Sequence, residues 1–139
     1  MFLPEPEYQA IHAWAAAHSP WDVPELERRS QDFDGFRLYD QENRCQFLDE
    51  HQACRLHKEG VKPTECFWWP FHVFAAADGA LEIRLFQACC DAYKHYVPGL
   101  PMLEIIEAQA RKIGLATIRS FRQVYPGTDT LPVVKQIRE

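Results

Sequence analysis

Five cysteines are the residues of this chain with the most informative chemistry: Cys45, Cys54, Cys66 and the adjacent pair Cys89 and Cys90. Metal–thiolate sites need several sulfurs to converge, usually from hairpins or loops that can orient them. Four thiolates suit a tetrahedral zinc ion or a four-iron cluster. The ordered set therefore predicts a metal site formed by four of the five cysteines. A free cysteine can also be a small buried apolar side chain, and that alternative stays open for each one taken alone.

Length and composition limit the classes of protein to which the chain can belong. Its 139 residues predict one domain over residues 1–139, and contents of 47% hydrophobic and 13% aromatic residues argue against disorder. The net charge of −5 argues against nucleic-acid binding, which normally needs a basic surface. No secretory signal and no membrane-length apolar run is visible. We therefore expect a soluble, cytoplasmic chain with no membrane partner, in which clustered cysteines more often bind metal or react than form disulfides.

The N-terminal half must position the first cysteines. Apolar residues at helical spacing predict a helix over residues 7–18, and a second short helix is expected over 21–30, with Asp22 as a candidate cap. Residues 36–39, 44–48 and 53–57 are strand candidates separated by polar turns, and together they predict a three-stranded meander. Cys45 and Cys54 would then lie on neighbouring strands, where Cβ atoms approach within about 5.5 Å.

The C-terminal half is expected to hold a hairpin and a long helix. Residues 71–75 and 80–86 flank Asp78-Gly79, a strong hairpin signal, and Cys89 and Cys90 follow its second strand. A helix is expected to about residue 125, weakened at Gly114, with the last dozen residues extended or frayed. The predicted fold class is a small α+β domain, with short antiparallel strands and hairpins that carry the cysteines and pack against N- and C-terminal helices.

The cysteines also stand in local contexts that resemble a known family. The strings in question are Cys45-Gln-Phe-Leu-Asp49, Cys54-Arg-Leu-His57, Lys62-Pro63-Thr-Glu-Cys66-Phe-Trp-Trp-Pro70-Phe71, and a hydrophobic strand leading into Cys89. Over about residues 44–92 the chain looks like the CxxCxxCC cysteine-cluster family, described as zinc- or iron-chelating and related to the flagellin lysine methylases. The resemblance implies Cys45, Cys54, Cys66 and Cys89 as ligands, with Cys90 competing for the fourth place. The family's run of closely spaced cysteines before the first helix is missing here, because no cysteine precedes Cys45.

The spacing and the neighbouring residues bear on which metal is bound. The wide spacing lacks the paired knuckles of zinc ribbons, and nearby aromatic residues could shield a cluster from water: Phe67, Trp68, Trp69, Phe71 and Phe86. We therefore expect an iron–sulfur cluster (4Fe-4S), with zinc as the alternative. His57 stands at a spacing from Cys54 that could serve zinc, although such a histidine more often supports a ligand or is solvated. Lys62 could offset thiolate charge.

Three functional classes are compatible with this pattern. The first is a metal- or cluster-binding protein whose site is structural or transfers electrons. The second, implied by the resemblance, is a small enzyme of the protein-lysine methyl-transfer type with a protein substrate, although the chain has no glycine-rich nucleotide loop. The third is a zinc-stabilised accessory module that docks a protein partner through an exposed patch around Trp68, Trp69 and Tyr96.

Overall fold

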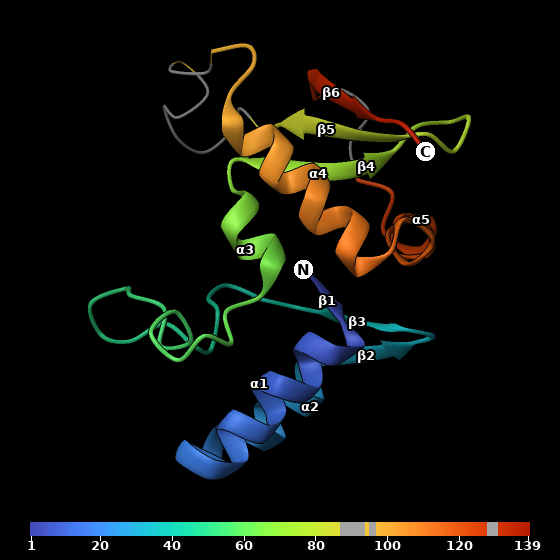
Figure 1. The fold of residues 1–139 in the computed structure, drawn as a ribbon. Coiled ribbons are helices and arrows are strands. Elements are labelled where there is room, and N and C mark those ends of the chain that lie inside the picture. Colours follow the sequence, from blue (N-terminus) through green and yellow to red (C-terminus); the bar gives the residue numbers. More distant parts are fainter. Residues whose placement is uncertain (87–93, 95–96, 128–130) are drawn as a thin grey trace. The chain divides into compact units, whose positions relative to one another are not determined.

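The structure is a computed structural model that describes residues 1–86, 94, 97–127 and 131–139. The chain forms two compact units, Met1–Cys66 and Phe67–Glu139. Five α-helices and two small antiparallel sheets in the described residues confirm the predicted α+β class (Figure 1). No described helix is both long enough and apolar enough to cross a bilayer.

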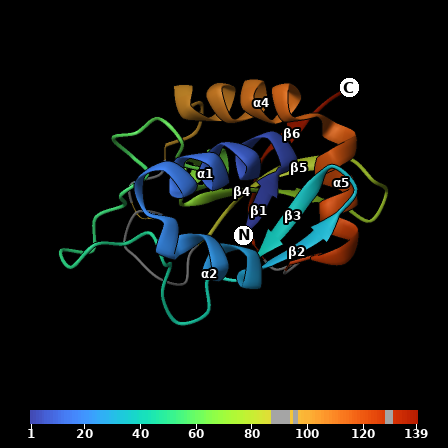
Figure 2. The same ribbon diagram turned by 90° about the horizontal axis from the view of Figure 1, so that it is seen from below.

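In the first unit, two helices pack on a three-stranded sheet. Helix α1 spans Glu5–His18 and confirms the predicted N-terminal helix. A 3₁₀ turn, η1 (Pro20–Asp22), leads into α2 (Val23–Arg29). The sheet has the order β1-β3-β2, with β1 at Phe2–Pro4, β2 at Ser30–Phe33 and β3 at Phe36–Tyr39. Figure 2 shows both helices alongside these strands.

The predicted meander of residues 36–39, 44–48 and 53–57 is wrong beyond its first strand. Residues 40–57 form consecutive turns, and only an isolated bridge joins Leu48 to Cys54. Asp49 explains part of this, because its carboxylate accepts the amides of His51 and Ala53 at 2.8 and 2.9 Å. Such local side-chain bonds compete with a strand ladder. The partners of β3 are instead β1 and β2, neither of which was predicted as a strand.

The second unit confirms the predicted hairpin and adds a third strand. Strands β4 (Phe71–Ala75) and β5 (Leu81–Leu85) pair antiparallel, and β6 (Val133–Ile137) pairs with β5. The C-terminal segment is therefore partly a strand of a sheet rather than frayed. The central strand of this sheet, β5, contributes Leu81 and Ile83 to the core, and both are fully buried.

The long C-terminal helix is two helices. Helix α4 (Pro101–Ile113) ends at Gly114, whose φ of 108° is outside the helical region, and α5 (Leu115–Val124) follows. Leu103, Ile106 and Ala110 form the buried stripe of α4, which lies along the sheet in Figure 1. Arg122 of α5 donates from Nε to the Val73 carbonyl at 2.7 Å, which ties this helix to edge strand β4. A glycine in a helix weakens it, and here the helix direction changes at that point.

Candidate metal centre

Three of the five predicted ligands lie in the described residues, and all three belong to the first unit. Cys45 lies in the turns that follow β3, Cys54 forms the bridge to Leu48, and Cys66 lies in the short helix α3 (Thr64–Trp68). All three are free thiols and half-buried. The cysteines are thus positioned by turns and one helical turn, not by strands of a meander. Cys89 and Cys90 lie outside the described residues.

Cys45 and Cys54 share a hydrophobic support. Both pack against one cluster of buried side chains, and so does Met1. The cluster consists of Leu3, Tyr8, Ile11, Leu26, Tyr39, Phe47 and Leu56. It draws from α1, α2, the strands and the turns, so the core of the first unit brings the two thiols to one neighbourhood.

Cys66 reaches this neighbourhood through contacts with the N-terminal strand. The preceding residue, Glu65, is buried and accepts the Phe2 amide at 2.7 Å. One residue earlier, the Thr64 amide and hydroxyl both donate to the carboxylate of Glu7, the amide at 2.9 Å. These bonds fix the start of α3 against β1 and α1. The Cys66 thiol itself donates to the Met1 thioether, with 3.2 Å between Sγ and Sδ.

The pKa of Cys66 reflects its burial and its charged neighbours. Burial, then the negative charges of Glu65, Cys45 and Cys54, raise the pKa of Cys66 to about 12, against the opposing effect of Lys62. Charges act at this strength only over short distances in a partly buried site. Cys66 therefore holds its proton unless a cation approaches, and Lys62 acts on this thiol in the direction that the sequence suggested.

Tyr39 is the polar neighbour of Cys45. Its side chain is buried, and burial followed by the charge of Cys45 raises the pKa of Tyr39 to about 12. The neutral hydroxyl donates to Gln46 Oε1 at 3.3 Å and accepts the Gln46 amide at 3.4 Å. A phenol that stays protonated can donate a hydrogen bond beside a thiolate.

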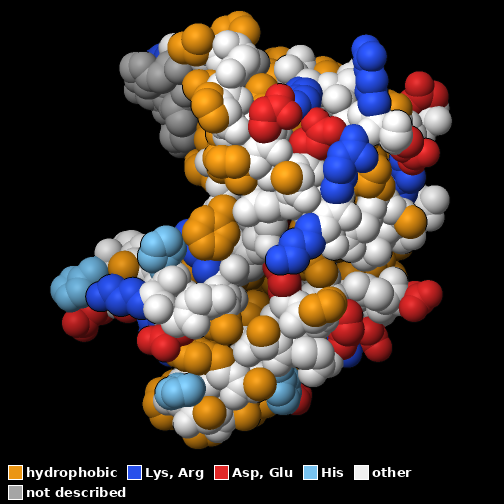
Figure 3. Space-filling view, viewed as in Figure 1, with side chains coloured by type: hydrophobic (Ala, Val, Ile, Leu, Met, Phe, Trp, Pro, Cys, Tyr) orange, Lys and Arg blue, Asp and Glu red, His pale blue; other side chains and the backbone are white. Residues whose placement is uncertain are grey.

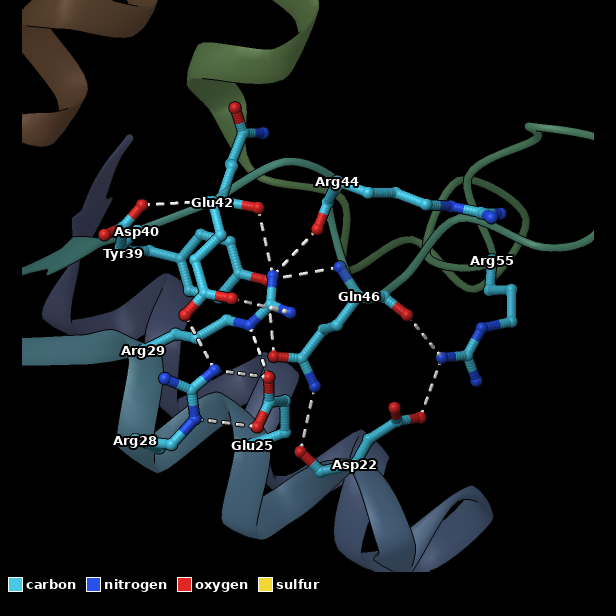
Figure 4. Close-up of polar contacts among 11 residues, drawn as sticks. Asp22, Glu25, Arg28, Arg29, Tyr39, Asp40, Glu42, Arg44, Gln46 and Arg55 are labelled. Atoms are coloured by element: carbon cyan, nitrogen blue, oxygen red, sulfur yellow. Dashed lines mark hydrogen bonds and ion pairs between the residues drawn. The ribbon is translucent and has the colours of Figure 1, made fainter.

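A network of arginines holds the residues that flank Cys45 and Cys54 (Figure 4). Arg29 of α2 donates from Nη1 to the carbonyls of Gln41 and Arg44, at 3.0 and 2.8 Å. Its Nε donates to Glu25 at 2.7 Å. Arg44 is the residue before Cys45, so α2 fixes the start of the cysteine turn.

The same network reaches Cys54 through Arg55. Arg55 donates to the Asp22 carboxylate at 2.8 Å and to the Gln46 carbonyl at 3.1 Å, while the Gln46 side chain donates to the Asp22 carbonyl at 2.9 Å. Asp22, expected as a helix cap, makes no side-chain cap bond and anchors Arg55 instead. Sequence patterns did not identify these positioning residues. The only signal was the Glu25, Arg28, Arg29 spacing, which is typical of any exposed helix.

The described residues hold no group of three His, Cys, Asp or Glu side chains that already has the spacing of a metal site. The donor chemistry suits a soft metal, because thiols are its preferred ligands. The three described thiols do not themselves have the spacing of a metal site. His57 is exposed at the end of the turns of residues 40–57. Figure 3 shows histidine and basic side chains on the surface of these turns.

The aromatic residues near the cysteine motif divide into buried and exposed ones. Trp68 is 1% exposed and donates from Nε1 to Gln109 at 2.8 Å. The predicted docking patch is therefore wrong for Trp68, which is a core residue of the second unit. Trp69 is 44% exposed, with its ring 5.3 Å from that of Phe86, and Tyr96 lies outside the described residues. Shielding of a cluster by these rings stays a prediction.

A shallow hollow of about 310 Å³ lies elsewhere in the first unit, lined by Tyr8, Gln9, His12, Glu27 and Arg37. Its charges are already compensated, because His12 contacts Glu27 at 2.9 Å and Arg37 contacts Glu5 at 3.1 Å. Arg37 also lies 4.4 Å from the centre of the Tyr8 ring. The hollow therefore offers a ligand no unpaired charge, and none of its lining residues is a cysteine.

Comparisons of the chain with models of protein families, with curated proteins and with solved structures find no match. What the site can do is therefore inferred from its own residues.

Proposed function

We propose that the chain is a metal-binding protein whose site is built from cysteine thiolates. Cys45, Cys54 and Cys66 are three of the ligands, and Cys89 or Cys90 supplies the fourth. The observation that carries the proposal is the shared neighbourhood of three cysteines: Cys45 and Cys54 pack with Met1 against one buried cluster, and Cys66 donates to Met1. Free thiols persist in a reducing compartment, so we place the protein in the cytoplasm.

The surroundings of the thiols support a thiolate–metal centre. A bare set of thiolates carries negative charge that burial makes costly, and a cation removes this cost. Lys62 opposes the negative charges at Cys66, and the neutral Tyr39 hydroxyl lies beside Cys45. The core cluster beneath Cys45 and Cys54 keeps one side of the site apolar.

The proposed occupant is an iron–sulfur cluster of the four-iron type, with zinc as the alternative. The cluster would supply one-electron transfer or structural support, and the resemblance of residues 44–92 to zinc- or iron-chelating proteins is consistent with both. Because no three described side chains already have metal spacing, the turns of residues 40–57 must adjust when the ion binds. Binding would then be coupled to rearrangement of these turns and would release thiol protons.

Metal and sulfide analysis of protein purified without oxygen tests this proposal. We expect iron and acid-labile sulfide in stoichiometric amounts, a brown colour, and broad absorption that is lost in Cys66→Ser. A colourless protein with stoichiometric zinc would replace the iron occupant by zinc and keep the thiolate site. Protein that carries no metal, and takes up neither iron with sulfide nor zinc on reconstitution, would overturn the proposal.

The adjacent cysteines provide a matched pair of variants. We expect one of Cys89→Ser and Cys90→Ser to lose the metal and the other to keep it, since only one is needed as the fourth ligand. Retention of metal in both single variants and in the double variant would refute a four-cysteine site.

A further inference from the structure

A methionine thioether lies beside the cysteine thiols. Met1 Sδ accepts the Cys66 thiol at 3.2 Å, and the Gln41 side-chain nitrogen lies 4.0 Å from the same sulfur. Met1 also packs against the cluster that supports Cys45 and Cys54. Four sulfur-bearing side chains from distant parts of the described sequence, three cysteines and one methionine, thus share one neighbourhood.

The position of Met1 is fixed by its backbone on both sides. Its amino group donates to the Tyr39 carbonyl at 2.7 Å, and the Tyr39 amide donates to the Met1 carbonyl at 2.9 Å. The next residue, Phe2, donates to Glu65, which immediately precedes Cys66. The register of β1 on β3 and the Glu65 contact therefore keep Met1 and Cys66 adjacent.

We propose that Met1 Sδ is a metal ligand together with Cys66 and one further thiolate from Cys45 or Cys54, and that this set binds Cu(I). The inference rests on the proposed function, because it uses the same thiols, and it concerns protein in which those thiols hold neither the cluster nor zinc. Soft thiolate and thioether donors favour Cu(I) among the metals of proteins. The thioether adds a donor without adding charge. Two thiolates and one thioether around a monovalent cation carry a net charge of about −1, which is less costly to bury than four thiolates around a divalent ion.

The distance between the two sulfurs is close to what an ion requires. Metal–sulfur bonds of about 2.3 Å to three donors in a trigonal plane place the sulfurs about 4.0 Å apart. The Sγ–Sδ distance of 3.2 Å is shorter than this by about 0.8 Å. Methionine is unbranched with three rotatable bonds, so its side chain can open this gap while its backbone stays paired.

Selenium labelling tests the role of Met1 directly. The chain has two methionines, so the Met102→Leu variant leaves Met1 as the only one. This variant is grown with selenomethionine, its intact mass is checked for residue 1, and it is loaded with Cu(I) without oxygen. X-ray absorption at the selenium edge should then show a copper–selenium path at bonding distance, and the path should disappear in Cys66→Ser. A copper-loaded protein without this path would overturn the inference.

Replacing methionine by norleucine in the same Met102→Leu variant removes the sulfur and keeps the shape of the side chain. We expect affinity for Cu(I), measured by competition with a chromophoric chelator, to fall at least about tenfold. Affinity for Zn²⁺, which the thiolates dominate, should change less than about twofold. Equal Cu(I) affinity in the two proteins would refute a ligand role for Met1 while leaving the cysteine site standing. Failure of every tested metal to bind would overturn both proposals.

Discussion

At the scale of single residues, Gly127 is the most tightly enclosed of the second unit's glycines that the structure describes. Its φ is +75°, and a Cβ built there would lie 2.1 Å from Cε1 of Phe74. Gly127→Ala must therefore move an aromatic ring of the sheet as well as adopt a left-handed backbone. Gly79 has a similar φ of +83°, but a Cβ added at Gly79 would meet no atom within 4 Å.

These two glycines make a matched pair. We expect Gly79→Ala to lower the free energy of unfolding by about 1–2 kcal/mol, the cost of a left-handed alanine. Gly127→Ala should cost about 1–3 kcal/mol more, because overpacking against Phe74 is added. Urea unfolding followed by circular dichroism measures both. Equal losses in the two variants would show that the Phe74 ring moves aside without cost.

A second residue-scale prediction concerns Glu25 and acid stability. Hydrogen bonds from Arg28 and then Arg29 lower the pKa of Glu25 from 4.5 to about 2. A carboxyl group whose pKa is lower in the folded state stabilises the fold above the unfolded pKa, and this contribution disappears as the pH falls toward the folded pKa. Glu25→Gln should therefore reduce stability at about pH 6 and flatten its decline between about pH 4.5 and 2.

Urea midpoints collected across that pH range check the prediction for Glu25. Glu59→Gln changes an exposed carboxylate of the loop and serves as the control. An acid profile of Glu25→Gln that runs parallel to the parent profile would contradict the role of the arginine contacts.

At the scale of elements, the contact between α2 and the cysteine turn is the one most open to a test. Arg29 and Arg28 are neighbours that both pair with Glu25, but their side chains are 12% and 56% exposed. Only Arg29 also donates to the carbonyls of Gln41 and Arg44, next to Cys45. A lysine keeps the charge at this position, but its single nitrogen cannot replace both Nη1, which donates to the two carbonyls, and Nε, which donates to Glu25.

Arg29→Lys should therefore lower the free energy of unfolding by about 1–3 kcal/mol, because the two carbonyls and Glu25 no longer share one guanidinium donor. Hydrogen exchange should become faster in residues 40–46, and the metal affinity of the thiol site should fall. Arg28→Lys, which changes only the exposed contacts with the carboxylates of Glu25 and Glu42, should raise exchange in that segment less. Faster exchange in both variants to the same extent would show that the ion pairs, not the carbonyl contacts, hold the turn.

The elements also show which features local sequence can predict. Helix α1 and the β4–β5 hairpin follow from periodicity and from Asp78-Gly79, signals that lie within the element itself. The meander failed because Asp49 forms turn bonds with its own neighbours, and because β3 pairs with strands from residues 2–4 and 30–33. The cysteines could be identified from residue type alone. Met1 and the arginine network could not, since their places depend on strand register and tertiary contacts.

At the scale of the whole molecule, the thiols connect separate parts of the first unit. Cys45 and Cys54 lie in the turns after β3, Cys66 lies at the end of the unit, and Met1 precedes β1. A metal held by these side chains closes loops that the unfolded chain leaves open. Metal that binds only the folded form stabilises it according to its concentration relative to the dissociation constant.

Removal of the metal should therefore lower the melting temperature. At a free metal concentration of about 100 times the dissociation constant the gain is about 2.7 kcal/mol, which for a chain of this size corresponds to about 10 °C. Calorimetry of the loaded protein, repeated after chelation, measures the difference. Cys66→Ser should melt at the same temperature with and without added metal, because it lacks a ligand. If chelation leaves the parent's melting temperature unchanged although metal analysis shows the ion removed, then the ion is not bound by the three thiols, since closing these turns must stabilise the unit that contains them.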